Sequence, residues 1–422
     1  MNKVLHWSIT VALAGFLFGF DAIVISGTDI ALQALWQSSD FYHGVVVMST
    51  ALWGTVLGAL FGNVPSNRLG RKKTLLFIGL AFLVSAIGSA LANNSITFAV
   101  FRFIGGLAIG ASTIAAPAYI TEITPSEKRG RLVALYQLSI VSGIIIAYIS
   151  NYTLHDLGAH AWRWMLGVEA IPAILFTIMV MRIPYSPKWL ALQGRLQEAR
   201  IVAQQLGLQD EVLTTIRHES IRAPFWTSQN RKPIFLAIFI AFFNQLSGIN
   251  GILYYSPRIF EAAGLSDQSA FLNSVGIGIT NLIFTLIGMY LIDRAGRKKL
   301  LYIGSIGYVV ALSLVGCSFL FGWTGMAVPV FIFLFIAAHA IGQGTVIWVF
   351  IAEIFPTNLR ATGQTVGSTI HWILAASISS AMPYLFKQFN PAYVFWGFAA
   401  IMVLQFAWIY VAVPETKGVS TD

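Results

Sequence analysis

Three ionisable side chains stand inside long apolar stretches of the sequence. Asp21 follows GFLFGF, Arg102 lies within TFAVFRFIGG, and Glu169 lies within MLGVEAIPA. A charge near the centre of a bilayer costs about 2.5–3.5 kcal/mol on insertion scales, so each of these residues is expected to have a partner and a function. They form either a static salt bridge or a proton site. In a proton site, Asp21 binds a proton and loosens its hold on Arg102, while Glu169 takes up the released cation.

Two charged loop motifs occur twice, in the same order. NRLGRKK and DRAGRKK form one pair of copies, and EITPSEKRGR and EIFPTNLRAT form the other. The duplication predicts two related halves. Cations and anions grouped at one membrane face can form a latch that closes when the halves meet there and opens when they separate. Alternatively, the motifs only anchor the topology. The candidate latch residues are Arg68, Arg71, Glu122, Arg129, Asp293, Arg294, Arg297, Glu353 and Arg360.

The composition predicts the elements that position these residues. Of the 422 residues, 57% are hydrophobic and only 10% are charged, whereas roughly a quarter of the residues in a soluble domain are charged. About 20 apolar residues span a bilayer, and many runs here are that long, so the chain is expected to be a polytopic helical membrane protein. The twelve predicted spans are 7–28, 42–66, 73–93, 96–120, 131–154, 162–183, 233–260, 269–292, 299–322, 327–351, 361–386 and 391–413.

A polar segment divides the twelve spans into two sets of six. We therefore predict an N-terminal bundle over 1–183, a linker over 184–232 and a C-terminal bundle over 233–422. The linker sequence PKWLALQGRLQEARIVAQQL is typical of short amphipathic helices at a membrane surface. Lys and Arg gather in alternate loops, with Lys387 as an exception. This bias predicts cytoplasmic termini and a cytoplasmic linker, and it explains the net charge of +9 without nucleic acid. The short tails and loops are typical of a bacterial protein, so we expect a bacterial inner membrane.

Several classes of protein lack support in the sequence. Cys317 is the only cysteine, so no intrachain disulfide or thiolate cluster can form. We find no metal-ligand spacing, no nucleophile–base motif and no Walker motif, so we expect neither an enzyme nor a bound cofactor or metal. Glycines at four-residue spacing predict close helix packing instead; they are Gly54, Gly58, Gly62, Gly106 and Gly110.

Taken together, the motifs resemble those of the sugar porter family of the major facilitator superfamily, close to its bacterial proton-coupled monosaccharide symporters. The resemblance covers nearly the whole chain through GFLFGFDAIVISG, NRLGRKK, FRFIGGLAIG, EITPSEKRGRL, QLSGINGILYYSP, DRAGRKK, EIFPTNLR and PETKG. It implies an all-α fold with two pseudo-symmetric six-helix bundles, a cytoplasmic helical linker and a mid-membrane sugar site reached alternately from each side. It also places Asp21 and Arg102 at positions linked in the family to proton coupling.

The resemblance also implies a set of substrate-binding residues. A sugar needs amides and hydroxyls for its hydroxyl groups and an aromatic face for its C–H surface. The alternative role for an isolated Asn or Gln is hydrogen bonding between helices. Gly248 and Gly251 favour binding for the amides beside them, because irregular backbone at membrane depth is tolerated where it lines a cavity. The candidates are Gln137, Asn244, Gln245, Asn250, Asn281, Trp348, His371 and Trp372.

Departures from the family pattern leave the identity of the sugar open. Asn244 stands where relatives often have Gln, His371 where close relatives have Gln, Ile144 where the xylose symporter has Gln, and Thr345 where Pro is expected. His371 either binds sugar or changes charge near neutral pH, or it is a neutral imidazole satisfied by a neighbouring helix.

Two more departures concern the loops. Asn67 replaces the usual Asp of the first loop motif, which predicts a weaker latch on the first half. Tyr185 stands where the family's PESPRWL motif has its acidic residue.

We therefore expect proton-coupled symport of a pentose or hexose by alternating access. The partners are a sugar, a proton and the bilayer, with no nucleic acid, and the chain is expected to work as a monomer. One alternative is proton-independent facilitated diffusion of a sugar or polyol. Another is a sugar sensor that does not transport, although family sensors carry long tails and this chain ends about nine residues after its last span.

Overall fold

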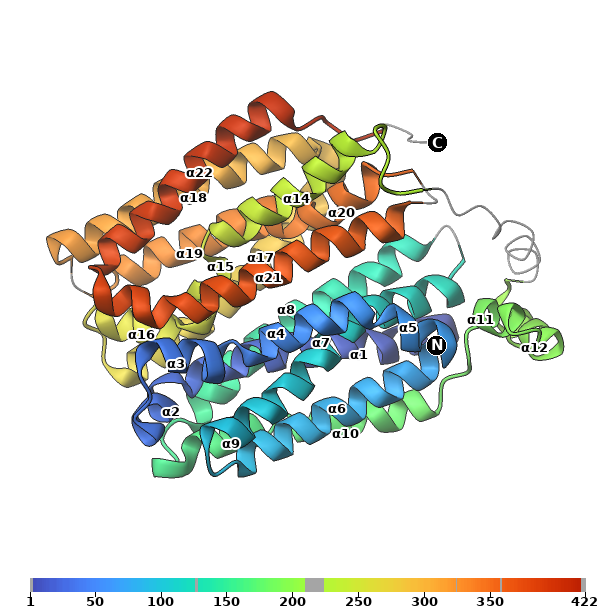
Figure 1. Ribbon diagram of the computed structural model, residues 1–422, viewed down its shortest axis with the longest axis horizontal. Helices are drawn as coiled ribbons and strands as arrows, with labels where there is room; N and C mark the ends of the chain where they lie inside the picture. Colours follow the sequence, from blue (N-terminus) through green and yellow to red (C-terminus); the bar gives the residue numbers. More distant parts are fainter. Residues whose placement is uncertain (1–2, 126–127, 209–223, 324, 357–358, 419–422) are drawn as a thin grey trace. The chain divides into compact units, whose positions relative to one another are not determined.

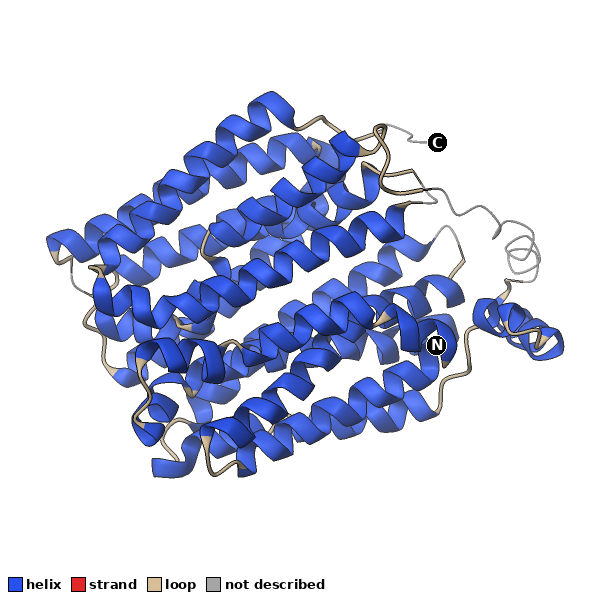
Figure 2. Ribbon diagram, in the orientation of Figure 1, coloured by secondary structure: helices blue, strands red, loops and turns tan. Residues whose placement is uncertain are grey.

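The computed structural model describes residues 3–125, 128–208, 224–323, 325–356 and 359–418. Within these ranges the regular structure is entirely helical, and Figure 2 shows no strand among them. Parts of three predicted features lie outside the described residues: 209–223 of the linker, and 126–127 and 357–358 of the repeated EI motifs.

Ten helices of the described chain are long and apolar enough to cross a membrane, and a bent pair, Asp40–Met48 with Thr50–Phe61 at 41°, makes an eleventh candidate. The remaining predicted span corresponds to α21, Arg360–Gln388. Its 29 residues extend for about 43 Å, which exceeds a bilayer core of about 30 Å. Polar residues such as Gln364 and His371 lower its hydropathy.

The first of two compact units contains residues 1–24, 50–150 and 154–222. Its long helices run side by side, α6 against α7 and α10, and α4 against α7 (Figure 1). The helices of this part of the chain are α1 (Lys3–Val24), α4 (Thr50–Phe61), α5 (Asn63–Arg68), α6 (Arg71–Leu91), α7 (Ser95–Ile123), α8 (Arg129–Leu154), α9 (Ala161–Gly167), α10 (Ala170–Met181), α11 (Pro187–Leu192) and α12 (Leu196–Leu206).

Glycines bring α4 and α7 into backbone contact, which confirms the predicted packing role. A Cβ on Gly106 would lie 1.9 Å from the carbonyl oxygen of Ala51, and a Cβ on Gly110 would lie 2.3 Å from that of Thr55. A Cβ on Gly58 would similarly lie 2.4 Å from the carbonyl oxygen of Leu107. Such close approach favours helix association in lipid, where no hydrophobic effect drives it. Any larger residue at these positions would force the two helices apart.

The second unit contains residues 25–49, 151–153 and 223–422. Segment 25–49 therefore packs with helices that follow it in sequence by some two hundred residues. The helices of this unit are α2 (Asp29–Trp36), α3 (Asp40–Tyr42), α14 (Arg231–Leu246), α15 (Ile249–Tyr254), α16 (Ser256–Ala262), α17 (Asp267–Ala295), α18 (Arg297–Phe321), α19 (Ala327–His339), α20 (Thr345–Glu353), α21 and α22 (Pro391–Ala412).

Two spans of the second unit are interrupted where the candidate sugar residues lie. α14 ends at Leu246, and Gly248 then adopts φ +82°, a left-handed conformation that glycine accepts without steric cost. This confirms the predicted break, although Gly251 lies inside α15 and contacts Met382 instead. Between α19 and α20 the chain forms a π-helical turn over Ala340–Gly344. Such turns frequently occur at functional sites.

The described part of the predicted linker forms two short helices, as expected. α11 is capped by the Ser186 hydroxyl, which accepts a hydrogen bond from the Trp189 amide at 3.2 Å. α12 ends at Gly207 in the left-handed conformation. The Trp189 indole covers Gly70 and donates to the carbonyl oxygen of Asn67 at 2.9 Å. The linker is thereby attached to the loop between α5 and α6.

Candidate functional site

Asp21, Arg102 and Glu169 meet inside the first unit, as predicted. They come from α1, from α7 and from the junction of α9 and α10, and each is at most 1% exposed. The Arg102 Nη1 donates to Oδ1 of Asp21, and its Nη2 donates to the main-chain oxygen of Asp21 at 2.9 Å. Glu169 interacts electrostatically with both side chains and lies within hydrogen-bonding reach of the Asp21 carboxyl group. These residues are called the charge trio below.

The charge trio contains two carboxyl groups and one guanidinium. If both carboxyl groups were ionised, the trio would carry one uncompensated negative charge in a fully buried position. An unpaired buried charge is strongly unfavourable, and such groups usually become neutral instead. One proton on Asp21 or Glu169 removes the excess charge. The geometry therefore allows a proton to be bound and the guanidinium to change carboxylate partners.

The candidate sugar residues of the second unit form a continuous polar cluster. The Gln245 Nε2 donates to Oδ1 of Asn244 at 2.9 Å, and the Asn250 Nδ2 donates to Oε1 of Gln245 at 2.7 Å. The same Nε2 lies 3.1 Å from Nε2 and 3.2 Å from Nδ1 of His371. A ring nitrogen that accepts this bond carries no proton. This contact matches the interpretation of His371 as a neutral imidazole satisfied by a neighbouring helix.

Aromatic rings border this polar cluster. The His371 ring centroid lies 5.1 Å from that of Trp348 and 4.9 Å from that of Trp372, the latter edge-on. The Gln364 Nε2 donates to the main-chain oxygen of Trp348 at 3.3 Å. Trp348 is half-buried, whereas Trp372 is buried. Amides beside indole rings are the groups that a sugar's hydroxyl and C–H surfaces need.

Two predicted sugar residues are not joined to this cluster by a described contact. Gln137 is half-buried in α8, in the first unit. Asn281 lies in α17, where its Oδ1 accepts a hydrogen bond from Thr285 at 3.4 Å. Thr345, which replaces the expected Pro, donates to the main-chain oxygen of Ala340 at 2.6 Å and so takes part in the π-helical turn.

A Tyr–His pair beside the cluster was missed by the sequence interpretation. The Tyr308 Oη lies 2.6 Å from Nδ1 of His339, and their rings are in contact. His339 is close enough to His371 to interact with it electrostatically. The available signal was a histidine and a tyrosine within two apolar spans. The pair adds a second polar group to the surroundings of His371.

We call Asn67, Arg71 and Glu122 the first loop cluster. Arg71 Nη2 lies 2.8 Å from Oε1 of Glu122, and both side chains are nearly buried. The Arg71 Nη1 donates to Oδ1 of Asn67 and to the main-chain oxygen of Ser66, each at 3.1 Å. Gly70 takes φ +86°, which lets the chain turn tightly before α6 begins.

We call Asp293, Arg297, Glu353, Glu415 and Thr416 the second loop cluster. The Arg297 guanidinium donates to both carboxylate oxygens of Glu353, at 2.7 and 3.0 Å, and lies 3.2 Å from Asp293. The Thr416 hydroxyl donates to Oε2 of Glu353 at 2.6 Å. Glu415 accepts the backbone N–H groups of Arg297 at 2.9 Å and of the next residue at 3.1 Å.

Glu415 thus caps the N-terminus of α18. Burial raises the pKa of the Glu415 carboxyl, but backbone N–H donors from its own segment and from the start of α18 outweigh that effect and hold the pKa below its usual range. The carboxylate also lies at the positive end of the helix dipole. The PETKG motif was noted in the sequence, but this capping role was not predicted.

The other predicted latch residues make different contacts. Arg129 donates through Nε to the main-chain oxygen of Thr124 at 3.1 Å. Arg294 lies 4.0 Å from the ring centroid of Tyr290. Arg68 is exposed, and the buried Nε of Arg360 has no hydrogen-bond partner in the described part of the chain.

An ionic network in the second unit was also missed. Asp29 of α2 is 1% exposed, and its Oδ1 lies 2.8 Å from Nε2 of His43. Arg258 of α16 binds both Asp29 oxygens, at 2.6 and 2.9 Å, and also donates to Gln33 at 2.6 Å. Burial raises the pKa of the Asp29 carboxyl, but the bonds from His43 and Arg258 outweigh burial and hold that pKa below its usual range.

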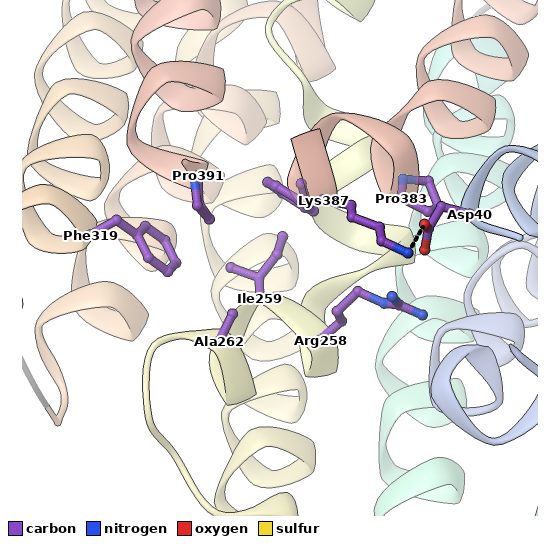
Figure 3. Close-up of a pocket in the computed structure, with 9 residues that line it drawn as sticks. Asp40, Arg258, Ile259, Ala262, Phe319, Pro383, Lys387 and Pro391 are labelled. Carbon is purple, nitrogen blue, oxygen red and sulfur yellow. Dashed lines mark ion pairs between the residues drawn. The ribbon is translucent and has the colours of Figure 1, made fainter. Parts of the chain in front are cut away.

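A pocket of about 370 Å³ lies next to this network. Arg258 and the ion pair of Lys387 with Asp40, at 2.9 Å, lie on one side of it, and Phe319 and Pro391 lie on the other (Figure 3). The charged side of the pocket joins segment 25–49 to α16 and α21.

Comparison with known proteins agrees with this architecture. A family model described as "Sugar (and other) transporter" matches residues 7–422. The arabinose-proton symporter of Bacillus subtilis is 35% identical over 100% of this chain and 94% of its own length. The D-xylose transporter of Levilactobacillus brevis is 35% identical over 97% of this chain and 93% of its own length. The glucose facilitated diffusion protein of Zymomonas mobilis is 31% identical over 99% of this chain and 96% of its own length.

Solved structures of a sugar transporter superpose on this chain over its whole length. The partially occluded inward-open conformation of the xylose transporter XylE from E. coli superposes with a TM-score of 0.88 at 27% identity, with complete coverage of both chains. A further structure of that protein is described as a major facilitator superfamily proton:xylose symporter, with a TM-score of 0.81 at 28% identity. The family and these neighbours are transporters rather than enzymes. This chain is an integral membrane protein of the sugar transporter family with the major facilitator fold, as its repeated motifs predict.

Proposed function

We propose that this chain is a secondary active transporter that carries a monosaccharide, a pentose or hexose, across the membrane together with a proton. The sugar binds within the membrane and is reached alternately from the two sides. Protonation of the charge trio makes the loaded protein competent to change state. The chain acts as a monomer and needs no cofactor.

The observation that carries this proposal is the charge balance of the charge trio. Asp21 and Glu169 face a single guanidinium in a position closed to water. A proton on Asp21 weakens its bond to Arg102, and Arg102 then pairs with the ionised Glu169. The cluster thus has two arrangements that differ by one proton, which is the property that coupling requires. A static salt bridge would need only one carboxylate.

The polar and aromatic cluster of the second unit supports the sugar as substrate. Gln245, Asn250 and Asn244 supply adjacent donors and acceptors, and Trp348 supplies a half-exposed ring face. We propose Gln137, Asn281, His371 and Trp372 as further contributors to binding. The arabinose-proton symporter and the D-xylose transporter among the relatives favour a pentose.

We propose that the two loop clusters act as latches on the cytoplasmic side. The pairs Arg71–Glu122 and Arg297–Glu353 order the ends of the helices on which they lie. Arg68, Arg129, Asp293, Arg294 and Arg360 add charge to the same loops. The Lys and Arg bias of the loops supports cytoplasmic termini. The polar segment between the two sets of six spans supports an N-terminal bundle over 1–183, a linker over 184–232 and a C-terminal bundle over 233–422, and the bacterial relatives support a location in a bacterial inner membrane.

Facilitated diffusion is the second candidate function. The glucose facilitated diffusion protein of Zymomonas mobilis, at 31% identity over 99% of this chain, is the observation that favours it. A facilitator exchanges sugar but cannot concentrate it. The two functions therefore differ in one measurable property.

Counterflow in proteoliposomes tests the proposal. The vesicles contain the full chain and are loaded with one member of a panel of pentoses, hexoses and polyols. Counterflow requires exchange but no net proton movement, so both the unaltered protein and Asp21→Asn should exchange the transported sugar. Only the unaltered protein should concentrate that sugar under an imposed pH gradient. Exchange without concentration in the unaltered protein would establish facilitated diffusion.

A further inference from the structure

One buried hydroxyl near the charge trio makes no hydrogen bond to its own helix. Ser85 of α6 is 0% exposed, and its Oγ has no hydrogen-bond partner among the described residues. Several other span hydroxyls of this unit, though not those of Ser8 and Ser89, donate to the carbonyl oxygen four residues earlier. These are Thr10, Thr55, Ser142 and Thr177, with distances of 3.0, 2.9, 2.9 and 2.8 Å. Ser85 leaves this local bond unmade, so its hydroxyl is available elsewhere.

The two oxygens of the Asp21 carboxyl group differ in their contacts, and the Glu169 carboxyl lies within hydrogen-bonding reach of the group. Arg102 binds Oδ1 and the main-chain oxygen of Asp21, whereas Oδ2 is buried and accepts no hydrogen bond among the described residues. Both free oxygens border Gly105 of α7. A Cβ on Gly105 would lie 2.4 Å from Oγ of Ser85 and 3.1 Å from Oδ2 of Asp21. The missing side chain at residue 105 leaves room for these two oxygens.

We propose that Ser85 is a positioning residue of the proton site: its hydroxyl, which makes no hydrogen bond in the structure described, turns to Oδ2 of Asp21 and directs the transported proton to that oxygen. This inference rests on the proposed proton coupling at Asp21. Since Oδ1 is committed to Arg102 in the ion pair, Oδ2 is the oxygen of Asp21 that is free to bind a proton. Ser85 thereby acts through Asp21 and does not itself take up the proton.

A hydroxyl suits this role because it can both donate and accept. It donates to Oδ2 when Asp21 is ionised, and it accepts from the O–H of Asp21 when Oδ2 carries the proton. Only rotation about the Ser85 side chain separates the two states. Alanine at residue 85 would leave Oδ2 without this partner in both states, and alanine at residue 105 would push the two oxygens apart.

Besides α5, which carries the exposed Arg68, four elements packed on α6 contribute the ionisable groups around Ser85. They are Asp21 of α1, Arg102 of α7, Glu169 before α10 and Arg163 of α9. The Arg163 guanidinium is held by the main-chain oxygen of Ala90 at 2.6 Å, beyond Ser85 at the end of α6. The Arg71–Glu122 pair lies at the opposite end of α6, about 21 Å along the helix from Ser85.

Infrared difference spectroscopy of the purified full-length protein tests the inference without a sugar. Spectra between high and low pH show the C=O stretch of the protonated Asp21 carboxyl, assigned by its loss in Asp21→Asn. Ser85→Ala should move this band to higher wavenumber, because the carboxyl group loses a hydrogen bond. Gly105→Ala should move it in the same direction, and Ser85→Thr, which keeps a hydroxyl, should restore the original position.

Ser89→Ala is the matched control. Ser89 lies one turn further along α6, is also buried, and has a hydroxyl without a partner among the described residues. Its loss should leave the Asp21 band in place. If the Asp21 band does not move in Ser85→Ala, or moves equally in Ser89→Ala, the role of Ser85 is refuted. The proposed proton coupling at Asp21 is not affected by either result. Absence of any band that depends on Asp21 would refute proton binding there, and with it both the proposed coupling and this inference.

Discussion

In the first loop cluster one guanidinium contact joins Arg71 to Glu122, whereas in the second Arg297 binds both oxygens of Glu353. The two arginines occupy equivalent positions in the repeated R-x-G-R-K-K motif. Each follows a glycine with nearly the same left-handed backbone, φ +86° at Gly70 and +87° at Gly296. Each also donates to the main-chain oxygen five residues earlier. The duplication thus preserves the backbone turn and the arginine.

The acidic partners of the arginine differ between the clusters. The first cluster has the neutral Asn67 where the second has Asp293, and the Trp189 ring covers Gly70 where Glu415 faces Gly296. Thr416 adds a further bond to Glu353. The repeated motif thus fixes the local backbone geometry, whereas the number of hydrogen bonds around it depends on segments outside the motif. We expect the second loop cluster to be the more stable one.

Glu353→Gln should have the largest effect on the stability of the two clusters. This change removes the negative charge of the Glu353 carboxylate. Both oxygens of that carboxylate accept hydrogen bonds from Arg297, and one of them also accepts from Thr416. Breaking a buried pair costs about 3–5 kcal/mol, and because Glu353 is partly exposed we expect about 2 kcal/mol. The matched variant Glu122→Gln removes a single contact and should cost about 1 kcal/mol. Thermal unfolding in detergent measures both, and an equal or larger loss for Glu122→Gln would contradict the comparison.

Glu415→Gln should have an intermediate effect, since a helix cap contributes about 1 kcal/mol. The pKa of Glu415 lies below its usual value near 4.5, so its stabilisation is present above that value and is lost as pH falls through the lowered pKa. The unaltered protein should therefore lose this contribution on acidification, whereas Glu415→Gln should lack it at every pH. Unfolding temperatures between pH 7 and about pH 3 test this. Parallel pH curves for the two proteins would show that the cap is not ionic.

Asn67→Asp should have the smallest effect. It restores in the first cluster the acidic residue found in the second, but position 67 is exposed, so we expect a gain of at most about 0.5 kcal/mol. The reciprocal change Asp293→Asn should cost a similarly small amount, because the Asp293 side chain is 81% exposed. If Asn67→Asp raised the free energy of unfolding by as much as Glu353→Gln lowers it, the difference in stability between the two clusters would come from residue 67 alone.

Much of the fold follows from local sequence. Runs of apolar residues predicted the spans, and Gly248 predicted the break after α14 because few other residues accept its backbone. The bend between Met48 and Thr50 was not foreseen, since the π-helical turn before it has no comparable sequence signal. The contact of segment 25–49 with α16 was also missed.

The sequence predicted those parts of the candidate site that contain a charged residue within an apolar span, because such a residue has few roles other than pairing with another charge. A charged residue in an apolar span needs a partner, which led directly to Asp21, Arg102 and Glu169. The Asp29–Arg258 bond joins residues 229 positions apart, and Asp29 follows a span in what looks like an ordinary loop. Ser85 gave no signal either, because buried serines in helices usually bond their own backbone. Its unused hydroxyl is visible only in three dimensions.

The most direct test of the central claim is whether sugar entry carries a proton through the charge trio. Proteoliposomes with equal pH on both sides receive the sugar found by counterflow, and the external pH is followed with an impermeant dye. Sugar should cause a transient external alkalinisation with the unaltered protein and none with Asp21→Asn, although both exchange the sugar. Sugar entry without a pH change in the unaltered protein, or an equal change in Asp21→Asn, would contradict the account.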